Sequence, residues 1–325
     1  MIIIIMGLKK IVNIKEIKSI KLASLTLAAS STAAILAFIY SIIILIFSGI
    51  LPAFLPQLGA FREIITGLGV VSVIVLPISA YFLIIIAGFF SALLYNLISS
   101  IMGGIKLKLD GNEIIQIPVI QFTIIIGSIE AIWAFIAGLF LAAAIIPFTN
   151  FISIAIHFIA NNVINAIDIT GVTILIDTVL GTNGFKLALI LIVGFPLIVF
   201  IFGLISNALF AIFYNYVATR IIRIQLDFEE ISGALHEIKS LPVVPSAAPV
   251  SGAVFGAFGV LMGLISLLSL ALTGNPSVGN LTNDIAVLVI NGLSYFIGYF
   301  LIFALVAVIY NFLVPRIGGI KLDLE

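Results

Sequence analysis

Long apolar segments alternate with short polar segments along the whole chain. Six of the apolar segments are long enough for a helix to cross a hydrocarbon layer roughly 30 Å thick, which requires about 20 residues. The pattern therefore predicts six transmembrane helices joined by polar connections. These segments are residues Leu25–Ile50, Val70–Ile98, Val119–Pro147, Leu187–Val217, Val250–Leu272 and Ile285–Val314.

The polar connections contain short segments in which apolar and polar residues alternate. The sequences "IKLKL" (105–109), "IQLDF" (224–228) and "IKLDL" (320–324) have the period of two that is typical of a strand with one buried face. Asp110–Gly111 joins the first of them to "NEIIQI", which is a strong hairpin signal. We expect each outgoing strand to pair with the next incoming strand, and the last strand to meet the first, near residues 14–20. Such a ring would protect the strand edges, and three separate hairpins are the alternative.

The same motif occurs three times at the inner ends of predicted helices. It reads "YNLISSIMGGIKLKL" from Tyr95, "YNYVATRIIRIQLDF" from Tyr214 and "YNFLVPRIGGIKLDL" from Tyr310. When the Tyr-Asn pairs are aligned, three residues that loosen a helix also align upstream, namely Pro77, Pro196 and Gly292.

The repeated motif divides the chain into tandem units of two spans each. The units are residues 14–110, 111–230 and 231–325, and residues 1–13 form an N-terminal cytoplasmic segment. The second unit has an additional outer segment, residues 149–184, whose pattern fits an amphipathic helix on the outer leaflet. The predicted fold class is an all-α polytopic membrane protein. Its three helical hairpins are expected in a pseudo-threefold arrangement, with short cytoplasmic strands at the junctions.

Composition agrees with the membrane assignment. The chain is 63% hydrophobic and 9% charged, whereas soluble domains carry about 25% charged residues. The chain has no cysteine, which excludes thiolate chemistry, and its two histidines argue against a zinc or haem site. We therefore expect neither a metal nor a cofactor. Nucleic-acid binding is not expected either, because the basic residues are dispersed.

The lysines and arginines indicate the orientation of the predicted helices. Twelve of the fourteen lie on the side that would hold both termini and the junctions, and two, Arg62 and Lys186, lie on the other side. Because positive residues are retained in the cytoplasm, we expect a multi-pass protein of the cell membrane with both termini cytoplasmic. The twelve residues are Lys9, Lys10, Lys15, Lys18, Lys21, Lys106, Lys108, Arg220, Arg223, Lys239, Arg316 and Lys321.

The repeated motif also resembles a known family. An ending such as "LYNLISSIMGGIKLKL" after the polar start "EIKSIKLASLTLAAS" is similar to the two-span actinobacterial and archaeal transmembrane domain of unknown function. The resemblance implies three fused copies of that domain and an internal pseudo-trimer within a monomer, but it brings no activity. The second copy departs from the family pattern, because Ile222–Arg223 replaces the Gly-Gly pair.

Few residues could carry chemistry. Glu130 is the one charge inside a predicted span and, with Ser128, is a candidate ion or proton site; a structural carboxyl bonded to Ser128 is the alternative. A polar ring at the inner membrane interface is the second candidate, and it could hold a cation or a lipid headgroup or simply supply interhelical hydrogen bonds. Its members would be Tyr95, Asn96, Tyr214, Asn215, Tyr310 and Asn311.

Two classes of function are compatible with these residues. The first is a non-enzymatic membrane scaffold or accessory protein that uses a cytoplasmic β-platform to hold an unidentified cytoplasmic or membrane protein. The alternative is a transporter or channel for a small solute or ion, with a path along the pseudo-threefold axis. No catalytic set of residues is recognisable in the spans, so we do not expect an enzyme.

Overall fold

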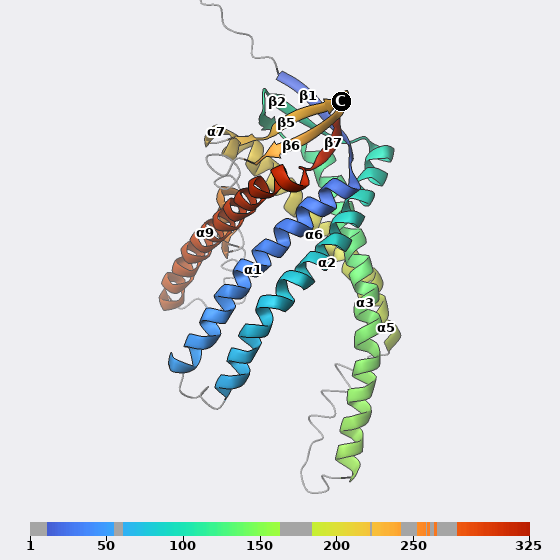
Figure 1. The fold of residues 1–325 in the computed structure, drawn as a ribbon. Helices are drawn as coiled ribbons and strands as arrows, with labels where there is room; N and C mark the ends of the chain where they lie inside the picture. Colours follow the sequence, from blue (N-terminus) through green and yellow to red (C-terminus); the bar gives the residue numbers. More distant parts are fainter. Residues whose placement is uncertain are drawn as a thin grey trace, which may run out of the picture. The chain divides into compact units, whose positions relative to one another are not determined.

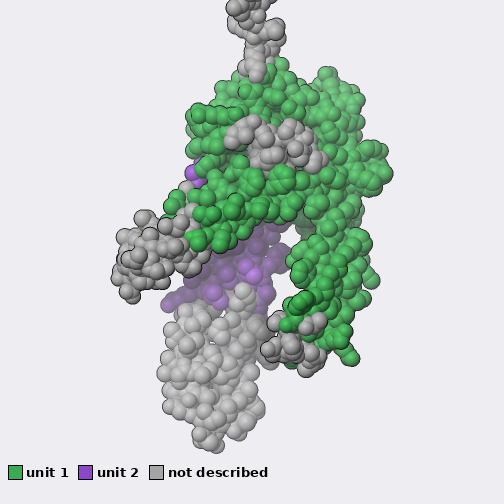
Figure 2. Space-filling view, turned by 90° about the vertical axis from the view of Figure 1, so that its left-hand side faces the viewer, with its two compact units in different colours: residues 1–121, 210–325 green, residues 122–209 purple. Residues whose placement is uncertain are grey.

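A computed structural model describes residues 12–54, 61–162, 184–221, 223–241, 252–257, 259–260, 263–264 and 278–325. The chain divides into two compact units (Figure 2). Unit 1 comprises residues 1–121 and 210–325, and unit 2 comprises residues 122–209. The two units are described separately below.

Three long apolar helices belong to unit 1: α1 (Leu22–Phe54), α2 (Arg62–Met102) and α9 (Val278–Ile317). Helices α1 and α2 run side by side (Figure 1). Two glycines show how closely the helices approach. A Cβ at Gly69 would overlap the Ser48 hydroxyl, and a Cβ at Gly88 would lie 3.3 Å from the Thr26 Cα. Small residues permit such close packing between apolar helices, where no hydrophobic effect drives association in lipid.

Strands β1 to β7 of the described residues form a single antiparallel sheet at one end of these helices (Figure 1). The strand order is β4-β3-β2-β1-β7-β6-β5. The strands are β1 (Val12–Ile20), β2 (Ile105–Asp110), β3 (Glu113–Gln116), β4 (Ile224–Gln225), β5 (Asp227–Ser232), β6 (Leu235–Ser240) and β7 (Lys321–Leu324).

The two ends of this strand order belong to one continuous piece of chain. Only Leu226 separates β4 from β5, and its N–H donates to the Asn112 carbonyl oxygen at 2.9 Å. Strand β4 pairs with β3, and β5 pairs with β6 on the other side of the sheet. The sheet therefore curves into a ring whose two end strands, β4 and β5, are joined by the chain and are not paired with each other within the described residues.

The pairing follows the connectivity predicted from the alternating segments. Strand β2 pairs with β3 across the Gly111–Asn112 turn, where Gly111 has a φ of 60°. Strand β5 pairs with β6, and the last strand pairs with the first through Ile17 opposite Leu324. The predicted meeting of the first and last strands is confirmed, and the alternative of three separate hairpins is wrong.

Apolar side chains fill the inside of the ring. On β2, Ile105, Leu107 and Leu109 are buried, whereas Lys106 and Lys108 between them are exposed. On β7, Leu322 and Leu324 are buried in a cluster that also contains Tyr310 and Val314 of α9. This cluster joins the sheet to a helix end, so the ring has a packed core.

Unit 2 contains most of α3 (Val119–Asn162), then α5 (Gly184–Leu189), a π-helical segment (Ile190–Gly194) and most of α6 (Phe195–Phe213). Helix α3 packs tightly against the following segments. A Cβ at Gly138, for example, would overlap the Leu191 carbonyl oxygen. A Cβ at Gly127 would lie 3.3 Å from a Leu204 methyl group.

The fold-class prediction is wrong. An all-α protein with six spans in three pseudo-threefold hairpins is not what the structure shows, because the junction segments form one seven-stranded sheet. Within the described residues, five helices are long and apolar enough to cross a membrane: Leu22–Pro52, Arg62–Met102, Val119–Ala144, Lys186–Ala218 and Gly292–Ile317.

The lengths of two predicted segments also differ from the structure. Most of the predicted span 250–272 lies outside the described residues. Helix α3 continues through Pro147 to Asn162, into the predicted outer segment, and residues 163–183 of that segment also lie outside the described residues. An apolar pattern locates a helix but does not fix its end or its partner helix, because such a helix has no single buried face.

Candidate functional site

The three Tyr-Asn pairs lie where helices meet the strand ring. Their tyrosines are almost fully buried, with 4%, 0% and 3% of Tyr95, Tyr214 and Tyr310 exposed. Small residues one turn earlier, Ala92 and Ala211, are also fully buried. A buried phenol requires hydrogen-bond partners for its hydroxyl.

Each tyrosine hydroxyl bridges two strands. The Tyr95 hydroxyl donates to the Ile17 carbonyl oxygen on β1 at 2.7 Å and accepts from the N–H of Ile105 on β2 at 3.3 Å. The other two hydroxyls have equivalent pairs of partners: Tyr214 has Ile114 O (2.5 Å) and Ile224 N (3.1 Å), and Tyr310 has Ile238 O (2.7 Å) and Ile320 N (2.9 Å).

Each asparagine binds the backbone at the last residue of a strand or just after it. The Asn96 amide donates to the Ile20 carbonyl oxygen at 2.9 Å and accepts from the Ile20 N–H at 2.7 Å. The same pair of bonds joins Asn215 to Ile117 and Asn311 to Leu241. Both polar groups of each amide are therefore used. The predicted polar ring consists of three Tyr-Asn locks, which bind strand backbone rather than neighbouring helices.

A glutamate and a glycine pair complete two of the locks. Glu16 accepts from the Gly104 N–H at 2.8 Å, and Glu237 accepts from the Gly319 N–H. Gly104 cannot carry a side chain, because its Cβ would overlap the Ile17 carbonyl oxygen. Its neighbour Gly103 has a φ of 81°, which favours glycine.

The lock of Tyr214 is completed by a different residue. Where the Gly-Gly pair is missing, the Arg223 guanidinium lies 3.0 Å from a Glu113 carboxylate oxygen and 3.6 Å from that of Asp110. A charged side chain thus replaces the backbone N–H as the partner of the glutamate. The sequence showed the missing glycines, but it did not show this replacement.

Charge–charge contacts hold the outer face of the ring, and two carboxyl groups have a lowered pKa. Burial alone raises the pKa of Glu237, but the Gly319 N–H and the Lys239 ammonium outweigh burial and lower it. Lys21, helped by the Ser19 hydroxyl, lowers the pKa of Asp323. Both groups lie on the side of the ring where the first and last strands meet.

In unit 2, Glu130 of α3 meets a partner that the sequence analysis missed. The Asn207 amide on α6 donates to the Glu130 Oε2 at 3.0 Å and to the Gly203 carbonyl oxygen at 2.8 Å. A Cβ at Gly203 would overlap that carboxylate oxygen. Ser128 lies two residues away on the same helix, and Asn207 takes the place expected for it. The signal available in the sequence was a single amide within an apolar run.

The three helix-loosening residues lie within helices. Helix α2 continues through Pro77, and α9 continues through Gly292. Pro196 follows the π-helical segment Ile190–Gly194, and a proline, which lacks an N–H, commonly accompanies such a local change of the helical ladder. Gly292 allows close packing instead, because its Cβ would lie 2.8 Å from a Val260 methyl group.

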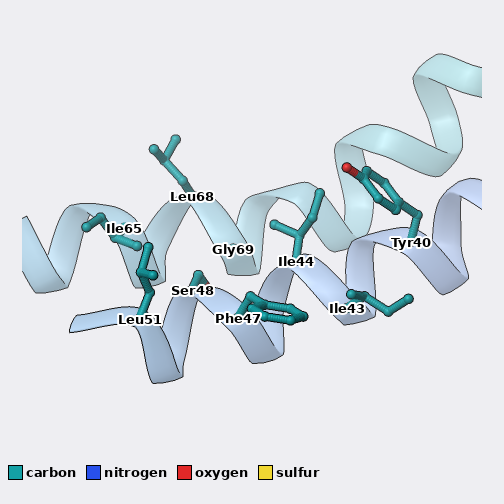
Figure 3. A pocket seen from close by; sticks show the side chains of 9 residues that line it. All are labelled: Tyr40, Ile43, Ile44, Phe47, Ser48, Leu51, Ile65, Leu68 and Gly69. Atoms are coloured by element: carbon teal, nitrogen blue, oxygen red, sulfur yellow. The ribbon is translucent and has the colours of Figure 1, made fainter. Parts of the chain in front are cut away.

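A groove of about 560 Å³ lies between α1 and α2 (Figure 3). Gly69 faces Ser48 within the groove, and the lining is otherwise apolar apart from the Tyr40 hydroxyl. Both walls belong to candidate spans. The lining residues are Tyr40, Ile43, Ile44, Phe47, Ser48, Leu51, Ile65, Leu68 and Gly69.

Comparison with protein-family models, curated proteins and solved structures gives no match to this chain. The resemblance to the two-span transmembrane domain therefore stays an expectation. Function is argued below from the contacts of the described residues.

Proposed function

We propose that the chain is a multi-pass protein of the cell membrane that acts as a non-enzymatic scaffold. The strand ring would face the cytoplasm and hold a partner protein at the membrane. The five long apolar helices support the membrane part of this proposal. The single observation that supports the scaffold part is a ring with a packed apolar core, tied to helix ends by three buried Tyr-Asn locks.

A ring built in this way is suited to rigid presentation of its outer surface. Each lock places two strands and the chain at the end of a strand with hydrogen bonds of 2.5–3.3 Å to backbone groups. A hydrogen bond to a buried backbone group is costly to lose, about 1–3 kcal/mol when its partner remains unpaired. Leu107, Leu322 and Leu324 are buried, which gives the described part of the ring an apolar interior.

Repeated contacts support a common origin for residues 14–110, 111–230 and 231–325. The same tyrosine and asparagine bonds occur in all three, although the spacing between them differs. We therefore propose three fused copies of one ancestral segment, in line with the resemblance to the two-span domain.

Cysteine labelling tests the orientation, because the chain has no cysteine of its own. Phe61→Cys at the start of α2 and Lys108→Cys on β2 are both exposed positions. We expect a membrane-impermeant maleimide to label the first variant in intact cells and the second only after permeabilisation. Labelling of Lys108→Cys in intact cells would place the ring outside and overturn the proposal.

Transport remains a second candidate because Glu130 and Asn207 form a polar contact inside candidate spans. Ion and metabolite flux into liposomes separates the two functions. Glu130→Gln should abolish flux through such a path, and Glu63→Gln, at an exposed position near the start of α2, is the matched control. Flux that depends on Glu130 but not on Glu63 would contradict the scaffold proposal.

A further inference from the structure

Strand β5 has a free edge. It pairs with β6 alone, and no described residue pairs with its other edge. The ring explains why: β4 ends its pairing with β3 at Gln225, and Leu226 bonds to Asn112 in the β2–β3 turn. Residues 227–232 therefore continue beyond the end of β3. Alternate N–H and carbonyl groups along this edge have no strand beside them.

The chemistry of this edge differs from the rest of the ring. Its sequence "DFEEIS" contains Asp227, Glu229 and Glu230 but no basic residue. Glu229 pairs with Lys239 at 3.0 Å, whereas no lysine or arginine among the described residues lies within ion-pair distance of Asp227 or Glu230. Ile231 is 45% exposed in the same strand.

Most other acidic groups of the ring have a basic partner nearby. Lys106 lies 3.6 Å from Glu16, Lys21 lies 2.7 Å from Asp323, and Lys18 lies 3.3 Å from Glu325. Their charges are compensated within the ring, so the uncompensated negative charge is concentrated on the β5 edge. A basic segment would therefore be attracted more strongly to the β5 edge than to other parts of the ring.

We propose that the outer edge of β5 binds an extended basic peptide of a partner protein as an additional strand. This inference rests on the proposed scaffold function and names its partner class. Backbone hydrogen bonds would supply affinity, and basic side chains at every second position would meet Asp227 and Glu229 on one face of β5. A second copy of this chain is a poorer occupant, because two acidic edges would repel each other.

Fluorescence anisotropy with a labelled octapeptide of alternating lysine and valine tests the proposal on the full chain in nanodiscs of neutral lipid. We expect saturable binding of this peptide. The same peptide N-methylated at every residue should lose binding, because neither of its edges can then donate the N–H groups of a backbone ladder. A glutamate–valine peptide should not bind. Equal binding of the N-methylated and parent peptides would overturn the proposal, since it would show charge attraction alone.

Two charge-reversal variants locate the site. Asp227→Lys should weaken binding roughly tenfold or more, whereas Glu325→Lys, the same charge change on another part of the ring, should leave it nearly unchanged. Equal weakening by both variants, or dimers of the unliganded protein seen by mass photometry, would overturn the proposal. Should Asp227→Lys fail to fold, the N-methylated peptide still decides the question on the unaltered chain.

The peptide assay and the labelling experiment fail independently. A ring found on the outside of the cell would contradict the scaffold orientation while the purified protein still bound the peptide. A cytoplasmic ring that ignores the peptide would contradict the docking edge and leave the scaffold proposal standing.

Discussion

The hydroxyl group of Tyr310 shows how one buried polar atom can position two strands. It donates to Ile238 of β6 and accepts from the N–H of Ile320, just before β7. The repeated motif identified this residue, but spacing alone suggested a polar ring at the inner interface that holds a cation or lipid headgroup or supplies interhelical hydrogen bonds. It could not show the partners, because these lie 72 and 10 residues away along the chain.

Tyr310→Phe should lower the stability of the protein by about 1–3 kcal/mol, since it leaves one buried carbonyl and one N–H without a partner. Tyr216→Phe is the matched control. Tyr216 lies two residues after Tyr214, but its ring is 64% exposed, so we expect a change within about 0.5 kcal/mol. The measurement is denaturant or thermal unfolding in detergent. Equal stability of the Tyr310 and Tyr216 variants would contradict the role of the lock.

At the scale of elements, the strands were more predictable than the helices. A period of two marks the buried face of β2 directly, and Ile105, Leu107 and Leu109 are buried as that pattern requires. The helices lack such a signal. Their apolar residues cover all sides, so the sequence gives no face on which α1 recognises α2 rather than another helix.

The contact between β6 and β7 should depend on pH through Glu237. Its pKa is lowered in the folded protein, so the unfolded chain takes up the proton first as the pH falls. The stabilisation is complete above the ordinary pKa of 4.5 and is lost as the pH falls below that value through the lower pKa of the folded state.

Glu237→Gln tests this dependence, because glutamine keeps the shape of the side chain and does not titrate. We expect the variant to be less stable than the wild type near neutral pH, and the difference to shrink as the pH is lowered below 4.5. Melting temperatures of both proteins across this range give the difference directly, and other carboxyl groups cancel in it. A difference that stays constant with pH would show that the Glu237 charge contributes nothing.

At the scale of the whole molecule, local signals specified pairs of neighbours but not the class of fold. The Asp110–Gly111 pair predicted one hairpin, whose turn is Gly111–Asn112 in the structure. The lack of any other partner for residues 320–324 predicted that the first and last strands meet. The joining of all strands into a single sheet depends on pairs such as Ile17 with Ile105 and Ile114 with Ile224, within each predicted repeat. No turn connects these strands directly, so no short segment of sequence predicts their pairing.

Closure of the ring between its first and last strands can be tested with an engineered disulfide. Ser19 lies opposite Asp323, and the Ser19 hydroxyl donates to the Asp323 carboxylate. Directly opposed residues of antiparallel strands have Cβ atoms about 4.5–5.5 Å apart, and a modest adjustment brings them within reach of a disulfide. Ser19→Cys with Asp323→Cys should therefore form a bond under mild oxidation. Ser19→Cys with Lys108→Cys is the control, because Lys108 is opposite Ile14, five positions farther along β1.

Mass spectrometry of proteolytic fragments reads the result, since the chain has no native cysteine to compete. A bond in the first pair alone requires the two ends of a 325-residue chain to lie side by side on one face of the membrane. Absence of that bond, or equal linkage in both pairs, would mean that the strands do not form a closed ring. The packed core that supports the scaffold proposal would then be open on one side, because β1 and β7 would each expose an unpaired edge.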